Sequence, residues 1–238
     1  MDWIEFENIL FDKPIHTINN NCSKNIVLFG SCHMATIGYM VNKFLNYEYN
    51  VHIIISWFFE KKGTINFNMN KIKDKIDDLI SKCDVFIYHP HINDYSVNAT
   101  ILPSITKENC LKLILPNYRL VYTNKTEDYE NSLNILTYHI LNSSFPEFYF
   151  LIENHKNIMF FNTSDHPTHY LLFLQSLALR NRILNNGENI NIHNYFSKIN
   201  RDYFRLFDNS YVYLPGREMI TKSINHNTGI NLNADYFD

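Results

Sequence analysis

The stretch NIVLFGSCHMA, residues 25–35, decides the fold of this chain. Its first half is a short run of β-favouring apolar residues that ends at Gly30, and a helix-like pattern follows at once. This pattern is typical of a buried strand, a tight turn and the N-terminus of a helix. Glycine permits backbone angles that other residues avoid and lets a ligand approach the main chain closely. We therefore expect the amides of Ser31, Cys32 and His33 to point outward at the positive end of the helix dipole.

Such a turn has two interpretations. It can hold a phosphate or the oxyanion of an acyl-transfer intermediate. Alternatively, its polar residues merely cap the helix. The turn presents a hydroxyl, a thiol and an imidazole in three consecutive positions, which makes it the first candidate for chemistry.

Apolar strands alternate with helices along most of the chain. After the strand that ends at Gly30, strands are predicted over about 51–59, 83–88, 110–115 and 157–161, and helices over about 34–46, 70–82, 127–141, 167–184 and 194–207. We interpret residues 1–24 as a lead-in that packs on the domain edge. Near-continuous apolar strands between helices indicate a parallel sheet covered on both faces. We predict one α/β domain over residues 1–238, with its core at about 25–185, built as a three-layer α/β/α, doubly wound and mainly parallel sheet.

Composition narrows the class of protein. The 238 residues are 45% hydrophobic and 19% charged, which is enough for a sizeable core. The formal net charge of -3 gives no general attraction to nucleic acid or acidic membranes. No apolar run is long enough to span a bilayer, and the N-terminus does not resemble a secretory signal. The four cysteines are widely spaced, which suggests reduced thiols in the cytoplasm.

Polar residues collect where the predicted strands end. Ligands of a doubly wound sheet bind beyond the carboxyl ends of its strands. The turns at these positions carry the candidate residues Gly30, Ser31, Cys32, His33, His89, His91, Asn117, Tyr118, Asp165 and His166, with His169 one turn further on. We therefore expect a single site that these residues share.

Two of these residues are the candidates for catalysis. A thiol at a helix N-terminus has a pKa below its ordinary value of about 8.5, so Cys32 is the candidate nucleophile. His166 is the candidate general base, because the start of a helix opposes the cation and keeps the imidazole neutral. Asp165 either orients His166 or caps the helix, and we favour the cap.

A metal site is the rival chemistry. His89, His91, His166 and His169 could converge on zinc, but none of their spacings is diagnostic, and we expect no metal. The sequence has neither the P-loop pattern nor the dinucleotide GxGxxG pattern. This disfavours nucleotide triphosphatases and dinucleotide enzymes.

Four motifs in order resemble a known family. They are GSCH at 30–33, DVFIY at 84–88, LPN at 115–117 and FFNTSDHP at 160–167. Over about residues 25–185 the chain resembles the WcbI-type polysaccharide-biosynthesis acetyltransferases, which are related in fold to the SGNH hydrolases and share their flavodoxin-like architecture. The family core reads Gly-Asn-Cys-Gln and Asn-His-Pro. Gly30, Cys32, His166 and Pro167 match it, whereas Ser31, His33 and Asp165 replace the asparagine, the glutamine and the second asparagine.

The resemblance implies a function. It implies transfer of an acetyl group from acetyl-CoA to an amino or hydroxyl group of a sugar or nucleotide-linked sugar. The asparagine-rich chain is also similar to the N-terminal acetyltransferase domain of giant-virus enzymes that acetylate the nucleotide-linked amino sugar viosamine. This second resemblance implies a piece of a longer polypeptide with a C-terminal glycosyltransferase domain, located in the host cytoplasm. Homo-oligomerisation is a further expectation.

Within the implied function, Ser31, Cys32, Asp165 and His166 would be catalytic, and the remaining candidates would bind CoA or sugar. Transfer through an acetylated Cys32 and direct transfer both stay open, and we favour direct transfer. Two other classes also stay open. One is an SGNH-like carbohydrate acetylesterase that uses water as acceptor. The other is a non-catalytic module that binds glycans or nucleotides.

Overall fold

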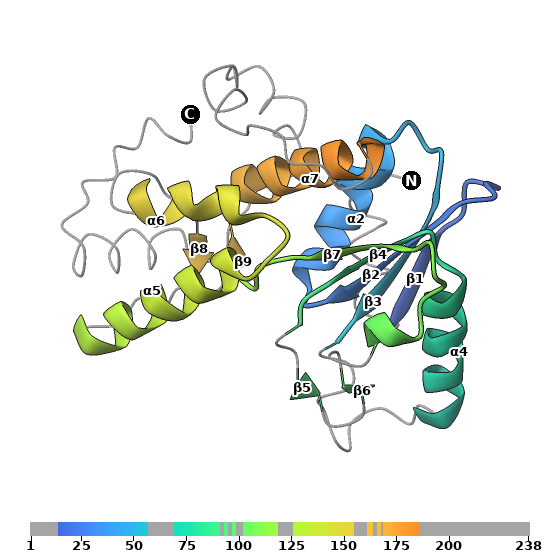
Figure 1. Cartoon of the computed structure of the whole chain (residues 1–238), viewed down its shortest axis with the longest axis horizontal. Coiled ribbons are helices and arrows are strands. Elements are labelled where there is room, and N and C mark those ends of the chain that lie inside the picture. The colour runs from blue at the N-terminus through green and yellow to red at the C-terminus, as the bar shows by residue number, and fades with distance from the viewer. Residues whose placement is uncertain are drawn as a thin grey trace. The chain divides into compact units, whose positions relative to one another are not determined.

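The computed structural model describes residues 14–56, 69–90, 93–94, 97–98, 102–118, 126–154, 161–163, 166–167 and 169–185 (Figure 1). Its strands are β1 Ile15–Ile18, β2 Asn25–Gly30, β3 Asn50–Ile55, β4 Val85–Tyr88, β5 Asn93–Asp94, β6 Val97–Asn98, β7 Leu111–Ile114, β8 Phe161–Thr163 and β9 His166–Pro167. Its helices are α2 His33–Phe44, α4 Met69–Lys82, α5 Thr126–Leu141, α6 Phe150–Asn154 and α7 His169–Leu184, with short 3-10 helices η1 Leu102–Ser104 and η2 Pro146–Tyr149.

The chain divides into two compact units. Unit 1 comprises Met1–Leu115 and Phe173–Ile190, and unit 2 comprises Pro116–Leu172 and Asn191–Asp238. We describe each unit by itself. The expectation of one domain over residues 1–238 stays a prediction.

Unit 1 contains a five-stranded sheet in the order β1-β3-β2-β4-β7. Strands β3, β2, β4 and β7 are parallel to their neighbours, and β1 runs antiparallel along β3. Numbered along the chain, the four parallel strands have the order 2-1-3-4, which is the doubly wound order of flavodoxin-like sheets. The predicted α/β class with a mainly parallel sheet is confirmed. The winding reverses direction between β2 and β4, and this reversal is the place where such sheets bind ligands.

The two faces of this sheet are covered by different helices (Figure 1). On one face, Val27, Phe29 and Phe86 form a buried cluster with Ile76 and Ile80 of α4. Helix α2 covers the opposite face, with the β3 side chain of Ile53 against Gly38 of that helix. A Cβ atom on Gly38 would lie only 2.7 Å from Cδ1 of Ile53, so this glycine is what allows α2 to approach the sheet closely.

The carboxyl-terminal part of α7, from Phe173 onward, packs against α2. The Ser176 hydroxyl lies 3.7 Å from Sδ of Met40, and Arg180 donates from Nε to the carbonyl of Phe44 at 2.9 Å. The rings of Phe44 and Phe173 meet edge to face, with centroids 5.5 Å apart. Helix α7 therefore adds to the α2 side of unit 1.

Four expectations about elements need correction or stay open. Residues 15–18, interpreted as part of a lead-in, form β1 of the main sheet. The strand predicted over 157–161 is described only from Phe161, and β8 pairs antiparallel with β9 in a separate ladder rather than joining the main sheet. Pro167 belongs to β9, so the last strong helix begins at His169 and not at position 167. The helix predicted over 194–207 lies outside the described residues.

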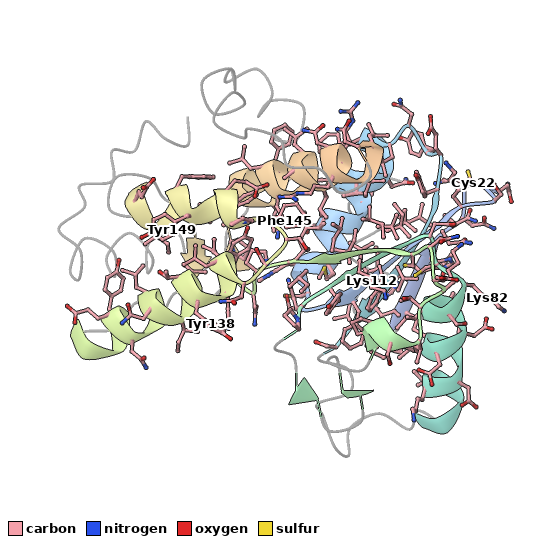
Figure 2. The ribbon with its side chains drawn as sticks, viewed as in Figure 1. Cys22, Lys82, Lys112, Tyr138, Phe145 and Tyr149 are labelled. Atoms are coloured by element: carbon pink, nitrogen blue, oxygen red, sulfur yellow. The ribbon has the colours of Figure 1, made fainter. Side chains whose placement is uncertain are left out.

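Unit 2 contains an aromatic cluster in its described part. Tyr118, Phe145, Phe148 and Phe150 are buried, with ring centroids 5.6–6.3 Å apart between neighbours. Nδ1 of His139 on α5 lies 3.2 Å from the carbonyl oxygen of Asn117. Exposed Tyr138 and Tyr149 come from α5 and η2 (Figure 2). The cluster thus joins the chain after β7 to the segment that follows α5.

Candidate functional site

The site in unit 1 begins where β2 ends, at Gly30. The Ser56 amide donates to the Gly30 carbonyl at 2.7 Å, and the His89 amide donates to the Phe29 carbonyl at 3.1 Å. These bonds extend the ladders on both sides of β2 to the very end of the strand. They bring His89, the first residue after β4, directly beside Gly30, at the point where the winding of the sheet reverses.

Crowding explains why position 30 is a glycine. A Cβ atom at this position would lie 2.6 Å from Nδ1 of His89 and 2.7 Å from Cε of Met34. The sequence-based argument was that glycine supplies unusual backbone angles and lets a ligand approach the main chain. The structure instead shows that it makes room for an imidazole and a methionine side chain.

His89 accepts a hydrogen bond from the turn. Its side chain is 1% exposed, and the Ser31 amide donates to its Nδ1 at 3.4 Å. A ring nitrogen that accepts a hydrogen bond carries no proton, so the ring proton of neutral His89 lies on Nε2. The expectation that the Ser31 amide points outward is therefore wrong, because this amide points to an imidazole of the neighbouring strand.

Cys32 occupies the N-cap position of α2. Its backbone is already helical, with φ -54° and ψ -26°, and its side chain makes no capping hydrogen bond. The amides of Met34 and Ala35 instead donate to the carbonyls of Ser31 and Cys32, at 3.0 and 3.1 Å. Because the half-buried thiol does not cap the helix, the interpretation of this turn as a simple polar cap does not hold for Cys32.

The two residues that flank Cys32 are less accessible. The Ser31 hydroxyl oxygen is buried and has no hydrogen-bond partner within the described part of the chain. The side chain of His33 is 7% exposed. The structure brings Gly30, Ser31, Cys32 and His89 together, with His33 at the first position of the helix behind them.

The remaining candidates fall elsewhere in the chain. In unit 2, Asn117 uses its carbonyl to contact His139, and Tyr118 is 1% exposed. Burial raises the pKa of Tyr118 well above its ordinary value, and the nearby charge of Glu147 adds to this shift. Tyr118 therefore packs as a neutral side chain within the aromatic cluster.

The histidines near the end of the predicted core are described only in part. His166 lies in β9 and His169 is the first residue of α7, and nothing is described of their side chains. His91 and Asp165 lie outside the described residues. The juxtaposition of Cys32 and His166 therefore stays a prediction.

The described residues also bear on the metal site and on membrane-spanning segments. Among the described side chains, no group of three or more His, Cys, Asp or Glu residues is arranged to hold a metal ion. Of the four histidines in the rival zinc site, only His89 has a described side chain, so that alternative stays open. No helix within the described ranges is both long and apolar enough to cross a bilayer.

The contact between the Ser31 amide and His89 was missed by sequence reasoning, which treated His89 as a substrate contact. The only available signal was that each residue follows an apolar strand. Their contact depends on β2 and β4 being neighbours, and the order of strands in a sheet cannot be read from a local pattern.

Comparison with known proteins gives one informative result. No protein-family profile and no curated protein matches the sequence. A solved structure of similar fold is that of WcbI, a polysaccharide biosynthesis enzyme, as the native protein without a disulfide bond between coenzyme A and one of its cysteines. The match covers 71% of this chain and 71% of that one, with a TM-score of 0.51 and 14% sequence identity. A likeness at this identity shows the fold alone, so membership of the WcbI-type family stays a prediction.

Proposed function

We propose that this protein is an acetyltransferase that moves an acetyl group from acetyl-CoA to a sugar or nucleotide-linked amino sugar in glycan biosynthesis. The observation that carries the proposal is the half-buried thiol of Cys32 at the N-terminus of α2, at the reversal point of the sheet. A second observation supports it. The chain has the fold of WcbI, a polysaccharide biosynthesis enzyme whose solved structure is that of the native protein without a disulfide bond between coenzyme A and one of its cysteines.

The turn offers a thiol rather than an activated hydroxyl. A serine nucleophile needs a base within hydrogen-bond reach of its hydroxyl. The imidazole that touches Ser31 contacts its backbone amide instead. We therefore propose that the acetyl group of acetyl-CoA binds next to the Cys32 side chain. His89 would hold the turn in position through its hydrogen bond with the Ser31 amide.

The turn would stabilise the negative charge that develops on the thioester oxygen in the transition state. When an amine attacks the thioester carbonyl, the oxygen becomes negative. We assign the stabilisation of this oxyanion to the amides of Cys32 and His33, in the first turn of α2 where the helix dipole is positive. Loss of one such donor costs on the order of 3–4 kcal/mol in other enzymes, so the backbone of the turn would contribute more than most side chains.

Proton transfer completes the reaction. In the direct route, the acceptor nitrogen forms a bond to the acetyl carbon, and His166 takes the proton that the nitrogen loses. The carbon–sulfur bond then breaks, and the CoA thiolate leaves with the electron pair. In the covalent route, Cys32 first takes the acetyl group and releases CoA, and the acceptor then attacks the new thioester. We favour direct transfer, because a thioester already reacts with amines without further activation.

The direct test uses the purified protein, acetyl-CoA and a panel of nucleotide-linked amino sugars. We expect mass spectrometry to detect an N-acetylated sugar together with free CoA. Cys32→Ala separates the two routes, since the covalent route fails without the thiol while direct transfer continues at a reduced rate. Cys22→Ala is the matched control, because Cys22 is also half-buried but donates to the backbone carbonyls of Asn20 and Tyr47. Absence of transfer to every sugar would count against the proposal.

The alternatives give different results in the same assay. An acetylesterase would release acetate from acetylated sugars in the absence of CoA. A binding module would shift its melting temperature with sugar or nucleotide but give no turnover. The giant-virus origin and the longer polypeptide with a glycosyltransferase domain remain proposals drawn from the sequence resemblance. The cytoplasmic location, which the cysteine pattern also suggests, and the homo-oligomer remain proposals as well.

A further inference from the structure

Two other cysteines lie together at the opposite end of the same sheet. Cys83 precedes β4 and Cys110 precedes β7, and these two strands are parallel neighbours. The two Sγ atoms are 3.5 Å apart. Cys83 is fully buried and Cys110 is 8% exposed. Both residues are therefore shielded within the sheet, and Cys110 is the more exposed of the two.

The surrounding backbone holds this pair in place. The Leu111 amide donates to the carbonyl of Asp84 at 2.9 Å, so the residues that follow the two cysteines are bonded to each other. The Asp84 carboxylate accepts from Lys107 Nζ at 2.5 Å and from the Asn25 amide at 2.7 Å. The register of β4 and β7 pairs Val85 with Leu111, so Cys110 is level with Asp84, one residue further along than Cys83. With strands about 4.8 Å apart and a rise of about 3.3 Å per residue, the two Cα atoms of such a diagonal pair lie about 6 Å apart, which is inside the range that a disulfide spans. A disulfide could thus form here through a small approach of the two sulfur atoms.

The two thiols differ in acidity. The hydrogen bond between them lowers the pKa of Cys110 and raises the pKa of Cys83, because the thiolate left by the first ionisation accepts from the thiol that remains. The Thr106 side chain and the charges of Lys112 and Lys107 lower the pKa of Cys110 further, whereas burial opposes the shift. Lys112 lies on β7 (Figure 2). Cys110, the more exposed of the two residues, is thus also the one whose thiol ionises first, and thiolates are the reactive form of cysteine.

We propose that Cys83 and Cys110 form a reactive dithiol that hydroperoxides convert to an intramolecular disulfide. The Cys110 thiolate attacks one peroxide oxygen and the O–O bond breaks, so that hydrogen peroxide gives a sulfenic acid and hydroxide. The hydroxide takes up the proton that Cys110 released on ionising and becomes the first water. The sulfur of Cys83 then bonds to the sulfur of Cys110 and displaces hydroxide, which takes the proton from the Cys83 thiol and leaves as a second water. Two thiols are oxidised and one peroxide is reduced.

This inference does not depend on the proposed acetyl transfer. The dithiol lies at the amino ends of β4 and β7, whereas Cys32 follows the carboxyl end of β2. The chemistry also differs, since the dithiol uses two sulfurs and a peroxide and needs no CoA.

A peptide map of the oxidised protein tests it. The folded protein is treated with hydrogen peroxide, unfolded with an alkylating agent present, and digested with trypsin. Cleavage after Lys82, Lys107 and Lys112 places the two cysteines in separate peptides, 83–107 and 108–112. We expect these peptides to be joined, and dithiothreitol to separate them. A disulfide between Cys83 and Cys110 would close the segment 83–110 into a loop, and we expect it to raise the melting temperature by roughly 5–10 °C.

Matched variants identify the sulfurs involved. Cys83→Ser and Cys110→Ser should each abolish the joined peptides, whereas Cys22→Ser and Cys32→Ser should leave them unchanged. The map of the wild-type protein decides the question even where a buried serine prevents folding. The proposal is overturned when both cysteines are recovered alkylated and unlinked after oxidation. It is equally overturned when the oxidant consumes Cys22 or Cys32 and forms no bond between positions 83 and 110.

Discussion

The two ends of the parallel sheet in unit 1 use polar residues in opposite ways. At the amino end, polar groups bind one another: the Asp84 carboxylate accepts from the Asn25 amide and from Lys107, and Cys83 faces Cys110. At the carboxyl end, the chain turns from β2 into α2, and the Cys32 thiol occupies a cap position without capping the helix. At the amino end the polar side chains therefore hold neighbouring strands together, whereas the carboxyl end carries a half-buried thiol that makes no capping hydrogen bond.

The contrast follows from the direction of the strands. Parallel strands bring the N-termini of their crossover helices to the carboxyl edge, where the helix dipoles attract negative charge. The amino edge receives the C-terminal ends of the helices and has no comparable attraction. Four predictions rest on this contrast and on the burial of the sheet, and the largest effect is expected at the carboxyl end.

Gly30→Ala should disturb the proposed site most. The added methyl group would have to displace His89 and Met34, which lie 2.6 and 2.7 Å from it. Misplacement of a catalytic turn by about 1 Å costs about 10²-fold in rate, and we expect a fall of this size in kcat/KM for acetyl transfer. Gly38→Ala is the matched control, because its methyl group meets Ile53 at 2.7 Å in the helix–sheet interface. It should lower the melting temperature yet leave the activity of the folded protein intact, and equal activity losses would break the distinction.

Replacing His89 tests the hydrogen bond that the Ser31 amide donates to its imidazole. His89→Phe removes the acceptor of the Ser31 amide, and a polar group that loses its partner in a buried place costs about 1–3 kcal/mol. His89→Asn retains an acceptor oxygen and should recover part of this loss. Urea unfolding measures both free energies of unfolding. Equal stability of the two variants would show that the bond to Ser31 does not stabilise the turn.

Asp84→Ala tests whether the carboxylate at the amino end of the sheet stabilises the fold. The variant loses both hydrogen bonds of the carboxylate, and we expect the free energy of unfolding to fall by about 1–2 kcal/mol with no change in acetyl transfer. Lys107→Ala removes only the ion pair, whose lysine side chain is 41% exposed, and should cost about 0.5 kcal/mol. A loss of activity in Asp84→Ala without a loss of stability would contradict the assignment of roles to the two ends.

The smallest expected effect concerns His52 on β3. Burial lowers the pKa of His52 below its ordinary value of 6.5, and the charge of Lys75 adds to the shift. The folded state therefore binds fewer protons than the unfolded state. The stability that depends on neutral His52 is fully present above about pH 6.5, the pKa of the unfolded state, and is lost as the pH falls through the lower pKa of the folded state. His52→Gln should remove this part of the pH dependence. Urea midpoints of both proteins at about pH 8 and about pH 5 measure it, and an unchanged difference between the two pH values would refute it.

Much of unit 1 could be predicted because its strands are buried on both faces. Ile26 to Phe29 and Val85 to Ile87 are almost completely inaccessible to water. Such strands appear in the sequence as continuous apolar runs, and the helices between them show the period of an amphipathic helix. The turn at Gly30 followed from the same local signal.

The elements that were misinterpreted depend on distant partners. Strand β1 has only four residues, and Thr17 among them is exposed, so its sequence lacks a continuous apolar run. It becomes a strand because it pairs with β3 across more than thirty residues of chain. Pro167 was expected in a helical first turn, yet its place in β9 results from pairing with Phe161. Local propensity carries no information about such pairings.

In the candidate site too, local features could be predicted from the sequence and contacts between distant residues could not. Gly30 and Cys32 were identified because their turn is local, and their place at the carboxyl end of β2 agrees with the prediction. The bond between Ser31 and His89 required the order of the strands, and the contact between Cys83 and Cys110 required the adjacency of β4 and β7. Two cysteines that are widely spaced in the sequence thus become a pair only in the fold.

The proposed acetyl transfer requires coenzyme A to bind with its sulfur beside Cys32. The most direct measurement treats the folded protein with CoA disulfide and follows the labelling of each cysteine by peptide mass mapping. We expect Cys32 to be labelled much faster than Cys22, which is also half-buried, and acetyl-CoA to protect Cys32 alone. Equal labelling of the two cysteines, with no protection by acetyl-CoA, would contradict it.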